Sequence, residues 1–96
     1  MIVRGSEAHV KQETKKFLNN IGAWHYWPVV RPEGEKTIDC HACHKGQFYG
    51  IETKKLGVLE PTKRQADKME EMRRGGAITL IISMDENYQL VWREIK

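Results

Sequence analysis

The segment at residues 39–55, DCHACHKGQFYGIETKK, holds the side chains whose types and spacing could do chemistry. Its centre, CHACH at residues 40–44, fits the C-x-x-C-H pattern of haem attachment, and its two cysteines and two histidines could also form a zinc site. Its borders carry Asp39, Glu52 and Lys54, which suit a hard divalent cation and phosphodiester hydrolysis. The local structure decides between these two kinds of chemistry.

The pattern of this segment predicts a β-hairpin that turns at Lys45-Gly46, where glycine supplies a positive φ. Because strand side chains alternate between faces, the potential ligands in CHACH divide two and two, and one tetrahedral site requires a broken strand. With a two-residue turn, Asp39 lies opposite Glu52, with Cβ atoms about 5 Å apart, and Lys54 points the same way. A three-residue turn would shift the register by one residue and break this pairing.

Two adjacent carboxylates repel each other, and a divalent cation between them removes the conflict. Mg²⁺ or Mn²⁺ suits hard carboxylate oxygens, polarises a phosphoryl oxygen and makes water more acidic, while Lys54 can position that water. The residues alone are equally compatible with a cross-strand Asp, Glu and Lys trio on a solvated face.

The rest of the chain supplies elements that could hold this hairpin. A helix is predicted at about residues 6–21, capped by Ser6 or Gly5, and a second helix begins at Thr62, which forms a capping box with Gln65. The remaining predicted segments are a strand at 23–30, loops at 31–36 and 56–61, an apolar strand at 77–83 buried on both faces, a turn at 84–87 and an edge strand at 88–95. The order α-β-β-β-α-β-β predicts an α/β fold with a mixed five-stranded sheet flanked by helices, in a single domain at 1–96.

The composition sets limits on function. The 96 residues include 16 Lys and Arg against 13 Asp and Glu, and the resulting charge of +3 permits a polyanionic partner without requiring one. The sequence has no apolar run long enough for a membrane span and no secretory signal, so we expect a cytoplasmic protein. In that reducing compartment the two cysteines are expected to be free thiols, most simply small hydrophobes in a strand, and covalent haem is disfavoured.

Asp39, the hairpin and Glu52-Thr53-Lys54 together resemble the D…(D/E)-x-K signature of the PD-(D/E)xK nuclease superfamily. More narrowly, the stretch KTIDCHACHKGQFYGIETKKLGVLEPTKRQADKMEEMRRGGAITLII resembles the VRR-NUC (virus-type replication-repair nuclease) domain in its stand-alone form. The resemblance runs from the first helix to the fourth strand. It implies a restriction-endonuclease-like core and an endodeoxyribonuclease that depends on Mg²⁺ or Mn²⁺.

The resemblance also implies roles for individual residues. Asp39 and Glu52 match the metal-binding acids, Lys54 matches the catalytic lysine, and Gln65 matches a helix glutamine that supports the substrate or the lysine. The family places a further metal-binding Glu in its first helix, where Glu7 and Glu13 compete in this sequence. On a helical wheel Glu7 lies within about 20° of the apolar stripe and Glu13 about 100° away, so Glu7 is preferred.

The family further implies a DNA partner. Stand-alone members resemble Holliday-junction resolvases that act as symmetric homodimers, so branched DNA is the expected substrate. The basic residues expected to contact phosphates are Lys55, Lys63, Arg64 and Lys68. Trp24, Tyr26 and Trp27 could stack on bases, fill a core or form a subunit interface. The alternative from another class is a small Cys/His module that binds zinc or haem and has no nuclease activity.

Overall fold

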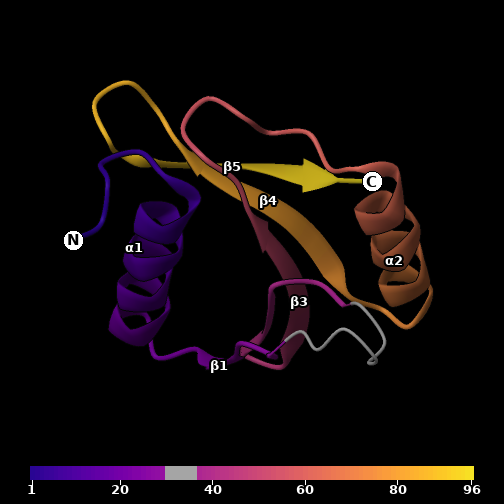
Figure 1. Ribbon diagram of the computed structural model, residues 1–96. Helices are drawn as coiled ribbons and strands as arrows, with labels where there is room; N and C mark the ends of the chain where they lie inside the picture. The colour runs from indigo at the N-terminus through magenta and orange to yellow at the C-terminus, as the bar shows by residue number, and fades with distance from the viewer. Residues whose placement is uncertain (30–36) are drawn as a thin grey trace.

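The computed structural model describes residues 1–29 and 37–96, which form one mixed sheet flanked by two helices (Figure 1). The elements are α1 (Glu7–Asn20), β1 (Trp24–Tyr26), β2 (Cys40–His44), β3 (Gln47–Thr53), α2 (Lys63–Arg74), β4 (Ile78–Met84) and β5 (Leu90–Ile95). Their order, α-β-β-β-α-β-β, confirms the order predicted from the sequence. Within the described residues, no helix is long and apolar enough to cross a lipid bilayer.

The strands lie in the order β1-β2-β3-β4-β5. β3 and β4 pair in parallel, and the other neighbouring pairs are antiparallel. A parallel pair needs a crossover connection, and α2 provides it between β3 and β4. The apolar strand β4 lies inside the sheet with its last four residues buried, whereas β5 forms one edge, as predicted.

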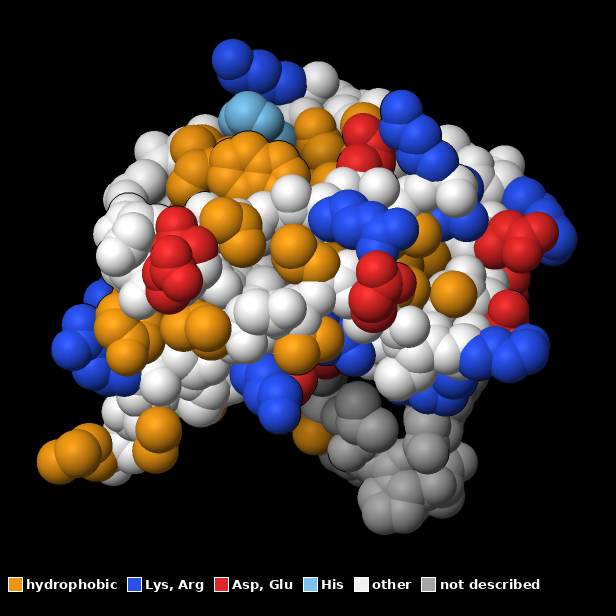
Figure 2. Space-filling model, turned by 90° about the horizontal axis from the view of Figure 1, so that it is seen from above, with side chains coloured by type: hydrophobic (Ala, Val, Ile, Leu, Met, Phe, Trp, Pro, Cys, Tyr) orange, Lys and Arg blue, Asp and Glu red, His pale blue; other side chains and the backbone are white. Residues whose placement is uncertain are grey.

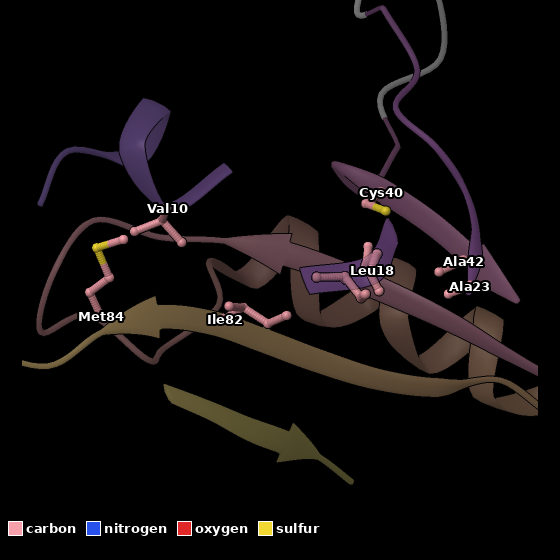
Figure 3. Close-up of a cluster of buried hydrophobic side chains, with 8 residues drawn as sticks. Val10, Leu18, Ala23, Cys40, Ala42, Ile82 and Met84 are labelled. Carbon is pink, nitrogen blue, oxygen red and sulfur yellow. The ribbon is translucent and has the colours of Figure 1, made fainter. Parts of the chain in front are cut away.

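The two helices cover opposite faces of the sheet (Figure 1). On one face α1 packs over the larger cluster, whose buried members are shown in Figure 3 and include Val10, Leu18, Ala23, Cys40, Ala42, Ile51, Ile82 and Met84. On the other face Met69 of α2 packs against Ile38 and Ile81. Since neighbouring strand residues point to opposite faces, Ile51 belongs to the α1 side and Glu52 to the α2 side.

Both helices begin at the predicted caps. Ser6 Oγ accepts a hydrogen bond from the His9 backbone N–H at 3.2 Å, and Thr62 forms the expected capping box with Gln65. The predicted apolar stripe of α1 is only partly buried, because Phe17 and Ile21 remain 40% and 39% exposed. These two side chains lie where the helix passes the β5 edge, and Phe17 stacks on Trp92 of β5 with ring centroids 6.4 Å apart.

Both edge strands are shorter than predicted, and β5 begins at Leu90 and not at residue 88. β1 ends at Tyr26, before Pro28, which has no backbone N–H to donate to a neighbouring strand. β2 begins at Cys40, since the chain bends at Asp39. The predicted loop at 31–36 and the last residue of the predicted strand at 23–30 lie outside the described residues.

Candidate functional site

The β2–β3 hairpin turns through two residues with positive φ, Lys45 at 49° and Gly46 at 81°. Positive φ at both central positions is typical of the type I′ turn, whose twist matches that of the flanking strands. The ladder then runs from His44↔Gln47 to Cys40↔Ile51, which confirms the predicted two-residue turn and its register. The next position along this register places Asp39 opposite Glu52.

At this open end of the hairpin, hydrogen bonds to the carboxyl groups of Asp39 and Glu52 replace the backbone–backbone hydrogen bonds between the strands. The Asp39 backbone N–H donates to Glu52 Oε2 at 3.2 Å. In return, Asp39 Oδ2 accepts hydrogen bonds from the Thr53 backbone N–H at 3.1 Å and from its hydroxyl at 2.9 Å. Both carboxyl groups are therefore fixed in position. The hydrogen bonds between Asp39 and the opposite strand involve side chains, so the backbone ladder of β2 begins only at Cys40.

Gln65 holds the second carboxyl group from the first turn of α2. Its Nε2 donates to Glu52 Oε1 at 2.9 Å, and its Oε1 accepts the Thr62 backbone N–H at 2.9 Å. Gln65 and Glu52 are 7% and 4% exposed, so this contact is buried. The side-chain amide of Gln65 thus acts on Glu52.

The position of Glu52 changes its acidity. The pKa of Glu52 is raised to about 8. The largest cause is burial, followed by the negative charge of Asp39 and a hydrogen bond between the two side chains. The Asp39 backbone N–H and the positive charge of Lys54 lower the pKa of Glu52 and so act in the opposite direction. The protein without metal therefore holds a proton on Glu52 at neutral pH.

A divalent cation fits this pair on chemical grounds. Two hard carboxylate groups lie side by side, one of them buried, and they carry more negative charge than the site can hold without a proton or a cation. Mg²⁺ is commonly bound by one or two carboxylates together with water and substrate phosphates. In the described part of the chain no cluster of three or more Asp, Glu, His or Cys residues gathers to form a complete protein cage.

The helix acids predicted as further ligands are not brought to this pair. Glu7 is exposed in the first turn of α1. A carboxylate in that position is stabilised by the helix dipole and by water. Glu13 pairs with Lys16 at 3.0 Å on the helix surface. α1 as a whole covers the face of the sheet opposite to Glu52 (Figure 1).

The predicted phosphate-binding residues lie near the ends of β3 and α2. Lys55 is exposed directly after β3, and its carbonyl accepts the Ser83 hydroxyl at 2.7 Å. On α2, Lys63 pairs with Asp67 at 3.0 Å, and Lys68 lies 3.5 Å from Glu71. Arg64 is exposed beside Gln65, so the helix turn that holds Glu52 also carries basic side chains.

The cysteines and histidines of CHACH are divided between the two faces, as strand alternation predicts. Cys40 is fully buried in the α1-side cluster, and burial raises the pKa of its thiol to about 12. Cys43 and His41 point to the other face, where His41 Nε2 lies 3.1 Å from the Thr37 hydroxyl and burial lowers the pKa of the imidazole. Both cysteines are free thiols, and they do not share a site.

Thr53 is the residue of this site that sequence reasoning missed. It occupies the central position of Glu52-Thr53-Lys54, and both its backbone N–H and its hydroxyl bind Asp39. The sequence indicates this role only through the position of the Thr53 hydroxyl between Glu52 and Lys54, the two expected site residues. Ile38, directly before Asp39, is fully buried under α2.

Comparison with known proteins locates the fold. No protein-family model matches the chain. No curated protein matches it either. Among solved structures, the chain is similar to Hjc, a Holliday junction resolvase from the archaeal hyperthermophile Archaeoglobus fulgidus, with a TM-score of 0.72 and 12% sequence identity over 91% of this chain and 75% of that one. This similarity shows a shared fold and confirms the predicted α/β architecture.

Proposed function

We propose that this protein is a metal-dependent endonuclease that hydrolyses DNA phosphodiester bonds and prefers branched DNA. The observation that carries the proposal is the Asp39–Glu52 pair, which is fixed by Thr53 and Gln65. Lys54 follows Glu52 by two residues, and its positive charge lowers the pKa of Glu52. The pair lies in a fold shared with a Holliday junction resolvase, which supports the choice of substrate class. The stand-alone VRR-NUC type is proposed on the sequence resemblance.

Each residue has a distinct part in this proposal. Asp39 and Glu52 would hold Mg²⁺ or Mn²⁺, which supplies Lewis-acid activation of the phosphate and of the attacking water when it is bound. Lys54 orients that water and stabilises negative charge, while Gln65 and Thr53 keep the two carboxyl groups in place. Glu7 stays a predicted third ligand, with Glu13 as the alternative. Phosphate contacts are assigned to Lys55, Lys63, Arg64 and Lys68.

We also propose a homodimer, which would offer two active sites to a branched substrate. Support comes from the α1 side, where exposed Phe17, Ile21 and Trp92 surround a cavity of about 200 Å³. Figure 2 shows one face of the molecule, on which hydrophobic side chains lie in several places among charges of both signs. An exposed apolar surface of this kind is typical of protein–protein contacts.

Cleavage of defined DNA substrates tests the proposed activity. Purified protein is incubated with Mg²⁺ or Mn²⁺ and with four-way junction, flap, single-stranded or plain duplex DNA. Wild type should cut the junction, and Lys54→Ala should lower the rate by about 100-fold or more, which is the usual contribution of a positioned proton-transfer group. Lys16→Ala is the matched control, because Lys16 is an exposed lysine on the helix that covers the other face. Failure of the wild type to cut any of these DNAs would overturn the proposal.

A further inference from the structure

α2 covers only part of its face of the sheet. Its buried side chains pack toward Ile81 of β4, and half-buried Ile95 of β5 joins the same cluster. The other part of this face is formed by β1, β2 and the start of β3. Because Cys40 and Ala42 point into the α1-side cluster, the residues between and beyond them on β2 must point to the α2 side.

Four rings occupy this uncovered part of the face: Trp24 and Tyr26 of β1, His41 of β2 and Phe48 of β3. The register aligns them, since Trp24 pairs with Cys43, Tyr26 with His41, and Cys43 with Phe48. We call these four residues the aromatic surface.

The rings form a continuous and accessible path. The rings of Trp24 and Tyr26 stack at 6.5 Å with an interplanar angle of 21°. His41 lies next to Tyr26 at 6.4 Å and next to Phe48 at 6.0 Å. Trp24, Tyr26 and Phe48 are 60%, 53% and 40% exposed, so these three rings are open to solvent.

The aromatic surface leads to the candidate active site. His41 lies two residues from Asp39 on β2, a separation of about 7 Å at the rise of a strand. Its partner on β3 is Gly50, which is buried under the Met72 side chain of α2, and Glu52 follows two residues later on the same side. A DNA strand lying on the rings would therefore approach the Asp39–Glu52 pair from the β2 side, next to His41, and not across Gly50, which Met72 covers.

The flank of α2 that borders this surface carries two basic side chains, Arg64 and Lys68, and Lys68 is paired with Glu71 at 3.5 Å. Arg73 donates to the Thr79 hydroxyl at 2.8 Å and to the Ile95 carbonyl at 3.2 Å, so its side of α2 faces β5. At 100° per residue, Lys68 and Arg64 project from α2 about 140° and 180° away from Arg73. They consequently lie on the flank of α2 that is turned toward β1 and β2.

Proteins bind single-stranded nucleic acid through exposed aromatic rings next to basic side chains. Bases stack on the rings, and the backbone phosphates lie along the positive charges. In plain duplex DNA the bases are already stacked and paired, so they have no free face to offer. We propose that the aromatic surface binds unpaired bases of the DNA strand that is cut at the Asp39–Glu52 pair. This inference rests on the proposed nuclease function and adds that the substrate carries a single-stranded segment beside the scissile phosphate.

Binding to DNA in the absence of divalent metal isolates this step from cleavage. Fluorescence anisotropy is measured with a short labelled oligothymidylate and with a blunt duplex hairpin. Trp24→Leu and Phe48→Leu should each weaken single-strand binding by about tenfold, since stacking on one ring typically contributes that much affinity. Trp24→Phe keeps a ring and should stay close to the wild type. Two separate positions are tested because β1 is short, and circular dichroism verifies that each variant is folded.

His25→Leu is the matched control, because His25 is a ring on the same strand as Trp24 but pairs with Ala42 and therefore points to the α1 side of the sheet. It should leave single-strand binding unchanged. The inference is overturned if folded Trp24→Leu and Phe48→Leu bind the oligonucleotide like the wild type, or if single-strand and duplex binding fall together. A change of oligomeric state in these two variants, without a change in DNA binding, would assign the surface to a protein partner and would also overturn it.

The failure of this inference and the failure of the proposed function give different results. If the wild type cuts DNA and the ring variants bind single strands normally, only the inference fails. If the wild type cuts no DNA but the ring variants lose single-strand binding, the surface is a base-stacking site on a protein without nuclease activity.

Discussion

Asp39 and Glu52 hold each other at the open end of the β2–β3 hairpin, where the backbone N–H of Asp39 donates to Oε2 of Glu52 at 3.2 Å. This contact brings two acidic side chains together in a place where one of them is 4% exposed. Thr53 and Gln65 then prevent either carboxyl group from turning away. The site is thus arranged in advance, and it needs a proton or a cation to be electrostatically balanced.

The pair makes the stability of the metal-free protein depend on pH. The pKa of Glu52 is raised from 4.5 to about 8 on folding, so the folded state binds this proton more tightly than the unfolded state. The resulting stabilisation is complete below about pH 4.5 and is lost as the pH rises toward about 8. Over this window the free energy of unfolding should fall by at most about 1.4 kcal/mol per pH unit. Urea denaturation of the wild type and Glu52→Gln measures the difference, because Gln stays neutral. Parallel pH profiles for the two proteins would contradict the prediction.

Metal binding should release a proton for the same reason. A cation requires the ionised form of Glu52, which carries a proton at neutral pH in the metal-free protein. Calorimetric titration with Mn²⁺ in two buffers of different ionisation enthalpy should show release of close to one proton. Asp39→Asn removes the neighbouring charge and one ligand, so it should bind Mn²⁺ more weakly and release less. Binding without proton release would show that Glu52 is not a ligand.

Gln65 should act on the site and not only on the helix. Gln65→Leu removes the amide that donates to Glu52, and loss of such a supporting contact typically lowers metal affinity or activity by about 10–100-fold. Thr62→Ala is the control, because it removes the capping hydroxyl at a cost of about 1 kcal/mol and leaves the Gln65–Glu52 contact intact. Thermal denaturation and Mn²⁺ affinity are compared for both variants. If they lose the same metal affinity, the effect belongs to helix stability.

The cysteines distinguish the nuclease from a Cys/His module. Cys40→Ala should destabilise the fold by roughly 1 kcal/mol, because a small buried side chain is replaced by a smaller one. Cys43→Ala should change little, since that thiol is only half-buried. The double variant should keep its structure and its cleavage activity, as measured by circular dichroism and the junction assay. Unfolding of the double variant, together with about one zinc per chain in the wild type, would favour the module instead.

The apolar surface on the α1 side should control oligomeric state. Trp92→Lys places a charge beside Phe17 at the mouth of the cavity and should convert a dimer to a monomer in light scattering. Trp24→Leu changes an equally exposed tryptophan on the other face and should leave the mass unchanged. A wild type that is monomeric at all concentrations would exclude the proposed dimer.

The hairpin register could be predicted from the sequence because few arrangements were possible. A two-residue turn with glycine and strict alternation place Asp39 opposite Glu52, and the observed pairing from His44↔Gln47 to Cys40↔Ile51 has this register. The helix starts were predictable for the same reason, since a cap at Ser6 or Thr62 depends only on neighbouring residues.

Features that depend on where elements sit in space could not be predicted. A helical wheel gives the direction of Glu7 relative to the apolar stripe, but not the position of the first turn of α1 along the sheet, and the side chain proved to be exposed. The role of Thr53 depends on its side-chain rotamer. The protonation of Glu52 depends on burial by α2, which no local pattern specifies.

The side chain of Gln65 makes two hydrogen bonds that connect the start of α2 to the carboxyl group of Glu52. The same amide closes the first turn of α2 through Thr62 and holds Glu52 through its other end. Local opening of that turn must therefore release the carboxyl group, and ordering of the carboxyl group must protect the turn. Amide hydrogen exchange at the start of α2 would report on how firmly Glu52 is held, and a metal bound to the Asp39–Glu52 pair should slow it.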